Sequence, residues 1–209
     1  MLNMNETINV TPKSPWYTLL TNPGQFFATR APQLSYGRLG LVVTVLSFLV
    51  NAVMNLYYFQ SPAFHLLTVK WTAAQLTQSK WISFIGPLIV PWTSAIFYSL
   101  FYWIVPKLFA TKITFRNALS LGLTVFLVSS LGSEIIDVIA TVITGHFHSG
   151  ITLLGDYLPA GTAIYALLGR FGLFSLLSWY VMGKAIAALT QLSSKKSYLI
   201  AFIIFFLAM

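Results

Sequence analysis

The chain contains no cysteine among its 209 residues. Disulfide bonds, thiolate metal sites and cysteine nucleophiles are therefore excluded. It also lacks three motifs that mark common catalytic sites, since no glycine-rich phosphate loop, no H-E-x-x-H and no G-x-S-x-G occurs. Ser129, Ser130 and Ser133 have no histidine in their own apolar stretch that could act as a base. We therefore expect a protein that is not an enzyme and has no catalytic residue, no cofactor and no metal.

Charge is also scarce. Only 8% of the residues are charged, 57% are hydrophobic and the mean hydropathy is +0.78, whereas a soluble domain carries about 25% charged residues. A chain with so little charge cannot cover itself in water, so its main solvent is lipid. Four acidic residues against twelve Lys and Arg give a net charge of +8. Since no basic run exceeds two residues, we expect the lipid bilayer as partner and no nucleic acid.

Apolar stretches of near-spanning length recur along the chain and predict an all-α, polytopic helical membrane protein with about five spans. Two prolines, Pro87 and Pro91, interrupt the second span, and we expect a kink there that faces the bundle, where neighbours can bond the freed carbonyls. The last stretch corresponds to about 20 Å of helix, which is short for a span. The five predicted spans are residues 39–60, 82–106, 117–143, 171–190 and 197–209.

The distribution of Lys and Arg predicts the orientation of the spans. With the N-terminus in the cytoplasm, only Lys70, Lys80 and Arg170 lie outside. Five spans then place the C-terminus outside. The cations on the predicted cytoplasmic side are Lys13, Arg30, Arg38, Lys107, Lys112, Arg116, Lys184, Lys195 and Lys196.

Two connecting segments are predicted to lie along the membrane surface. Residues 1–37 form a cytoplasmic segment, ahead of a transmembrane domain at 38–209, and Asn22-Pro23 begins an interfacial helix there with Asn as N-cap. Residues 62–79 have the apolar spacing of a second amphipathic helix, on the outer surface. Residues 157–169 are apolar but too short to span. The expected membrane-anchoring side chains are Trp16, Phe26, Phe27 and Trp71.

A few polar side chains within the spans form the candidate interaction site. Glu134 and Asp137 lie three residues apart and hence on one helix face. They either pair with a cation such as Arg170, which would lock two helices together, or form an acidic site for a cation, a proton or a basic peptide. Asn51 and Asn55 share a face of the first span, and packing between helices is favoured there over a polar pathway. His146 and His148 are interpreted as part of a polar outer loop rather than as metal ligands.

Three stretches resemble the Yip family of five-span membrane proteins, named for Ypt/Rab-interacting proteins. They are T-N-P-G-Q-F-F from Thr21, I-T-F-R-N-A-L-S-L from Ile113, and F-S-L-L-S-W-Y-V-M-G-K from Phe174. The resemblance is greatest to bacterial, YknW-like members, which accompany an ABC exporter in defence against toxic peptides. It implies a bacterial cytoplasmic membrane. The family has no established catalytic residue, so it supplies none here.

We therefore expect a non-enzymatic membrane protein that acts by association with another membrane complex, such as an ABC exporter or a toxic-peptide immunity system, or with copies of itself. One alternative is a small transporter or channel with a polar site near Glu134, Asp137 and Arg170. A second is a membrane-shaping or lipid-organising protein that uses its interfacial helices.

Overall fold

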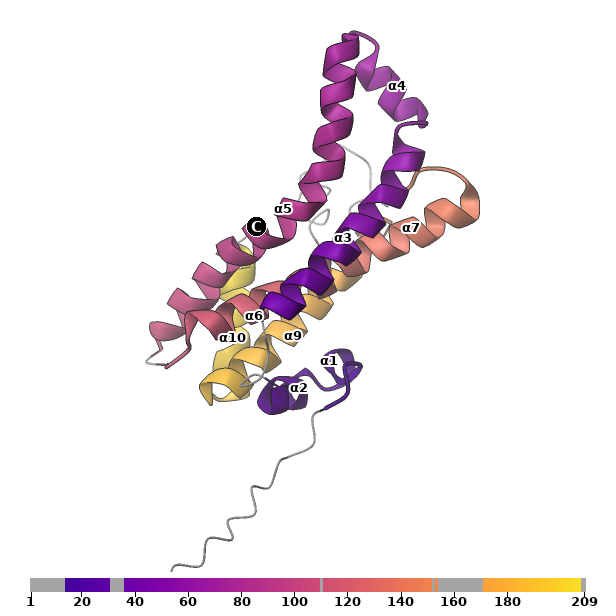
Figure 1. Cartoon of the computed structure of the whole chain (residues 1–209). Helices are drawn as coiled ribbons and strands as arrows, with labels where there is room; N and C mark the ends of the chain where they lie inside the picture. The colour runs from indigo at the N-terminus through magenta and orange to yellow at the C-terminus, as the bar shows by residue number, and fades with distance from the viewer. Residues whose placement is uncertain (1–13, 31–35, 110, 152, 154–170, 208–209) are drawn as a thin grey trace, which may run out of the picture.

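The computed structural model describes residues 14–30, 36–109, 111–151, 153 and 171–207, and these residues are almost entirely helical. Figure 1 shows long helices that run up and down, with a pair of short helices at the lower end. The long segments are α3 (Tyr36–Tyr58), α5 (Ala73–Lys107), α6 (Phe115–Phe126), the π-helix η2 (Leu127–Leu131), α7 (Gly132–Thr144), α9 (Leu173–Thr190) and α10 (Ser194–Leu207). The short ones are α1 (Thr18–Thr21), α2 (Pro23–Arg30) and α4 (Pro62–Thr68). The predicted all-α membrane fold is confirmed.

Four helical segments are long and apolar enough to cross a membrane. They are Tyr36–Tyr58, Ala73–Lys107, Phe115–Thr144 and Leu173–Thr190, and they correspond to the first four predicted spans. The segment Phe115–Thr144 runs through α6, η2 and α7 without a break. α10 has 14 residues and packs beside α9 and α5, so a fifth span stays a prediction.

α6 lies at the centre of the bundle and contacts α3, α5 and α9. Every residue from Ala118 to Phe126 is buried. Gly122 allows the closest approach, because a Cβ there would lie 2.8 Å from the carbonyl oxygen of Ala95 and 2.6 Å from Ser99 Oγ on α5. Ser99 Oγ also donates to the carbonyl oxygen of Ala118 at 3.1 Å. Small residues bring two membrane helices together in this way, since van der Waals packing replaces the hydrophobic effect in lipid.

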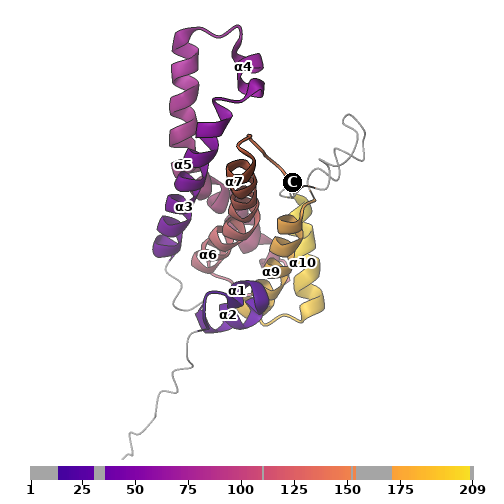
Figure 2. The same ribbon diagram turned by 90° about the vertical axis from the view of Figure 1, so that its right-hand side faces the viewer.

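The predicted outer amphipathic helix at residues 62–79 is interrupted. α4 ends at Thr68, and α5 begins at Ala73 and continues to Lys107. A capping box starts α5, since Gln75 N donates to Thr72 Oγ1 at 3.3 Å and Thr72 N donates to Gln75 Oε1 at 2.8 Å. The apolar spacing from Phe64 to Ala74 therefore crosses a break between two helices. In both views α4 and the first part of α5 project beyond the other helices (Figures 1 and 2).

The N-terminal helices α1 and α2 dock on the bundle. Asn22 caps α2 as predicted, since Gln25 N donates to its Oδ1 at 3.3 Å and Pro23 is the first helical residue. The structure places Phe26 and Phe27 inside the protein, 0% and 1% exposed, on a helix that packs against α9. These two rings therefore hold α2 to the bundle instead of reaching lipid. Trp16 is 52% exposed, and membrane anchoring by Trp16 and Trp71 stays a prediction.

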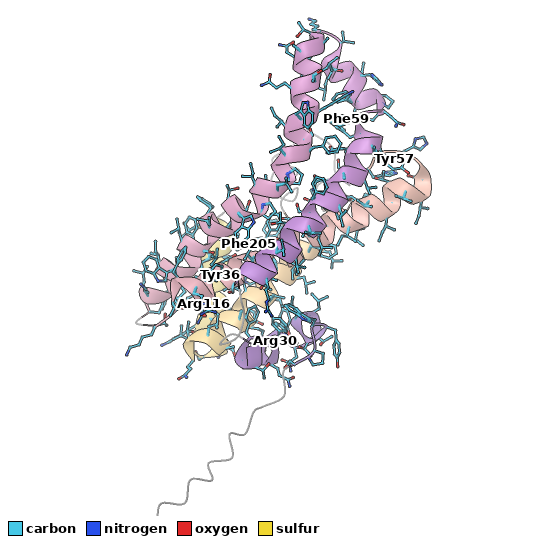
Figure 3. All side chains as sticks on the ribbon, in the orientation of Figure 1. Arg30, Tyr36, Tyr57, Phe59, Arg116 and Phe205 are labelled. Carbon is cyan, nitrogen blue, oxygen red and sulfur yellow. The ribbon has the colours of Figure 1, made fainter. Side chains whose placement is uncertain are left out.

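The cations separate toward the two ends of the bundle. Figure 3 labels Arg30 and Arg116 at the lower end, where α3 begins and α5 ends, and Tyr57 and Phe59 toward the upper end. Lys70 and Lys80 belong to the opposite end, in the turn before α5 and in its first turns. Lys80 Nζ lies 5.7 Å from the centre of the Phe59 ring. Arg170 lies outside the described residues. This separation is the arrangement on which the predicted orientation depends.

Candidate functional site

A polar groove opens in the upper half of the bundle, between α3, α5 and α7, and has a volume of about 250 Å³. Three residues of α3 line it, each four positions after the last, so they share one helix face. They are Ser47, Asn51 and Asn55. Glu134 of α7 borders the same groove. The remaining lining residues are Ile82, Ser83, Gly86, Pro87 and Val90 of α5 and Phe126 of α6.

Asn51 and Glu134 are joined across the groove. Asn51 Nδ2 donates to Glu134 Oε2 at 3.1 Å and to the carbonyl oxygen of Ser47 at 3.0 Å. Both protons of the amide therefore have an acceptor, one within its own helix and one on α7. In the part of the chain that the structure describes, no Lys or Arg forms an ion pair with Glu134. An acidic side chain within a spanning helix is costly in lipid and marks a candidate functional position.

Asn55 completes the backbone hydrogen bonding of the kinked helix α5. Pro87 has no N–H, so the carbonyl of Ser83, four residues earlier, lacks its helical donor. Asn55 Nδ2 donates to that carbonyl oxygen at 3.1 Å. Figure 1 shows that α5 changes direction along its length. The prediction that a neighbouring helix would satisfy a carbonyl freed by proline is confirmed in this contact.

Asp137 has a different role from Glu134, although only one helical turn separates them. Asp137 is 6% exposed. Its carboxylate accepts hydrogen bonds from Gly150 N at 2.8 Å on Oδ2 and from Ile151 N at 3.1 Å on Oδ1. The carboxylate thus fixes the chain that follows α7. Arg170 is the predicted partner of this acidic pair, and it lies outside the described residues, so that pairing stays a prediction.

The two histidines after α7 form hydrogen bonds with threonines at the end of that helix. His148 N donates to Thr141 Oγ1 at 3.0 Å, and its Nε2 lies 2.9 Å from Thr144 Oγ1. Among the described residues, no three His, Cys, Asp or Glu side chains gather as metal ligands would.

Sequence reasoning identified Asn51, Asn55 and Glu134 but did not identify Ser47 or Ser83. Both could have been found by position, because Ser47 precedes Asn51 by four residues and Ser83 precedes Pro87 by four. The first spacing extends a polar helix face, and the second marks the carbonyl that a proline frees.

Apolar helices of spanning length, cations separated at the two ends and a polar groove between helices define a polytopic membrane protein. Residues 17–209 match the Yip1 domain family. The chain therefore belongs to the Yip1 domain family, as its three motifs suggested.

The chain also has a weaker similarity to an individual membrane protein. It is 28% identical over 106 residues to membrane protein YknW of Bacillus subtilis (strain 168), an alignment that covers 51% of this chain and 46% of the relative. The match thus spans about half the length of that relative. No solved structure matches the chain.

Proposed function

We propose that this protein works by lateral association with another membrane protein, and that the polar groove receives one of the partner's spans. The proposal rests on the position of Glu134. Its carboxylate borders the groove, and among the described hydrogen bonds only the one from Asn51 reaches it. A basic side chain on a partner helix would compensate that carboxylate where water is scarce.

The walls of the groove favour a helix as occupant. Its edge on α5 faces outward, with Ile82 61% and Val90 48% exposed. On α7, the apolar side chains beyond the groove also face outward, including Ile135 and Ile139. A partner span could therefore meet apolar surface on both sides and a polar group between them, which is the pattern by which membrane helices associate.

The family resemblance suggests a more specific partner. A permease subunit of an ABC exporter, or a component of a toxic-peptide immunity system, is the first candidate, with a Lys or Arg inside one of its spans. We place the protein in the bacterial cytoplasmic membrane with the N-terminus in the cytoplasm and, if α10 crosses, the C-terminus outside. Terminal tags that label from opposite sides of intact cells would support this topology, and labelling from one side would contradict it.

Site-specific photocrosslinking in native membranes tests the association. A photoreactive residue at Ile82 is expected to capture a membrane protein, whereas the same residue at Phe97, which is exposed on α5 but does not line the groove, is not. The Ile82 crosslink should be lost in Glu134→Gln, which keeps the size and removes the charge. A charge exchange, Glu134→Lys with an acidic residue in the captured span, should restore it.

Two outcomes would overturn the association. One is a crosslink at Ile82 that persists unchanged in Glu134→Gln. The other is recovery of the chain alone from native membranes, together with normal toxin tolerance in a strain that lacks it.

A transporter or channel is a second candidate, because the groove brings Glu134 next to a proline-interrupted helix, as ion and solute sites often do. Flux into liposomes that contain only this protein separates the two functions. Flux that falls in Glu134→Gln supports transport, and no flux above that of empty liposomes favours association.

A further inference from the structure

A second cavity, of about 420 Å³, lies between α5, η2, α9 and α10. Phe126, the last residue of α6, borders both this cavity and the groove, so the two adjoin at that side chain. Its volume falls within the range of about 300–1,000 Å³ that is usual for small-molecule sites. Nothing in the proposed association uses it.

Seven side chains with hydroxyl groups line this cavity, two tyrosines and five serines. The tyrosines are Tyr98 and Tyr102 of α5. The serines come from η2, the start of α7 and the first turns of α9. They are Ser129, Ser130, Ser133, Ser175 and Ser178.

The π-helix presents two of these serines in succession. η2 covers Leu127–Leu131, and a π-helical turn inside a spanning helix is rare and often occurs at a functional site. Ser129 Oγ donates to the carbonyl oxygen of Val125 at 2.8 Å, which leaves its lone pairs available to accept. Neighbouring Ser130 borders the same cavity.

Among the residues that the structure describes, no Asp, Glu, Lys or Arg lines the cavity. An ionised ligand would lose its hydration there without a counter-charge, which is unfavourable. Hydroxyls donate and accept, and therefore suit an uncharged ligand that does both, such as an alcohol with neighbouring ester groups.

Apolar side chains complete the lining on the side of α9 and α10. Phe174, Met182, Ile204 and Phe205 supply them. The neighbouring side chains of these helices face outward, with Leu173 66% and Phe206 46% exposed. A ligand with an acyl chain could therefore enter from the bilayer and keep that chain against these rings.

We propose that this cavity binds a neutral lipid of the diacylglycerol class, with the glycerol hydroxyl and esters among the serines and an acyl chain along Phe174 and Phe205. Gly132 shapes the apolar part, because a Cβ there would lie 2.5 Å from Phe174 Cδ1.

Binding of two matched lipids to the full chain in detergent tests the proposal. Dioctanoylglycerol and dioctanoyl phosphatidic acid carry the same chains and differ by one phosphate, and native mass spectrometry can compare their occupancy. We expect saturable binding of the neutral lipid and at least tenfold weaker binding of the anionic one. The double variant Ser130→Ala with Ser175→Ala should bind the neutral lipid about tenfold more weakly, from the loss of two hydrogen bonds. Ser83→Ala, which changes a serine of the groove instead, should bind it normally.

A photoactivatable diacylglycerol on the unaltered chain provides a test that does not depend on how a variant folds. Crosslinks are expected on peptides that contain Phe174–Met182 and Ile204–Phe205. Equal binding of both lipids, unchanged binding in the double serine variant, crosslinks confined to other helices, or no saturable binding, which would mean a cavity filled by water only, would each overturn the proposal.

Discussion

The two halves of α5 make different contacts with the rest of the bundle. Its lower half packs directly on α6, where Gly122 leaves no room for a methyl group beside Ala95 and Ser99. Its upper half, around Pro87, lines the polar groove together with α3 and α7 and meets α3 through the hydrogen bond from Asn55 to the Ser83 carbonyl. At Gly86 in that half, a Cβ would meet nothing within 4 Å. The lower half is thus built for close packing, and the upper half leaves polar groups and space for an interaction.

The largest loss of stability is expected from Gly122→Val. The added carbon atoms collide with the backbone of α5, and overpacking of this kind costs about 1–3 kcal/mol and occasionally more. Thermal unfolding in detergent should show a clearly lower midpoint. Gly86→Ala is the matched control on the groove side and should be neutral or slightly stabilising, because alanine favours a helix over glycine by up to about 1 kcal/mol. Equal destabilisation by the two changes would remove the difference between the halves.

A smaller loss is expected from Asp137→Ala, at about 2 kcal/mol. The change leaves the N–H groups of Gly150 and Ile151 without their acceptor. Proteolysis and hydrogen exchange should show the segment after α7 opening more readily. Asp137→Asn keeps one carbonyl acceptor, so its protection from exchange should lie between those of Asp137→Ala and the unaltered protein. Equal protection in Asp137→Ala and the unaltered protein would contradict this role.

Removal of the amide in Asn55→Ala should cost about 1 kcal/mol, because the carbonyl of Ser83 then has no donor. Pro87→Ala restores a backbone N–H at the position that can bond this carbonyl. The double variant should therefore recover most of the loss, and a double-mutant cycle of unfolding midpoints measures the coupling. Additive effects of the two changes would show that Asn55 does not compensate for the proline.

The smallest effect on stability is expected from Glu134→Gln, within about 0.5 kcal/mol, since the glutamine oxygen can still accept from Asn51. Its effect on association should nevertheless be large. Measuring both the unfolding midpoint and the photocrosslinking yield of this variant separates its effect on stability from its effect on association. A strongly destabilised Glu134→Gln would assign the carboxylate to the fold instead of to a partner.

Much of the architecture could be predicted because lipid imposes strong rules on sequence. The first four spans follow from apolar length, and the start of α2 follows from Asn22-Pro23. The sidedness inferred from Lys and Arg stays a prediction. The break between α4 and α5 was missed because apolar spacing continued across it. The local signal was Thr72 with Gln75 three residues later, which forms a capping box.

The candidate site could be predicted only in part. Asn51, Asn55 and Glu134 stand out because polar side chains are rare in spans. Their partners did not follow from that rarity, because Asn51 contacts Glu134 across 83 positions of sequence and Asn55 contacts a backbone carbonyl of another helix. The hydroxyl-lined cavity was not predicted either, since serine is common in spans and only packing gathers five of them.

By itself, the sequence determined that this chain is a membrane protein, where its four long apolar helices lie and where its positive charges are concentrated, because each of these depends on local composition and its transfer to lipid. The tertiary structure alone decided that Glu134 borders an open groove while Asp137, one turn away, binds backbone N–H groups. The physical reason is that helical spacing defines a face, whereas the partner of that face depends on how helices distant in sequence pack together.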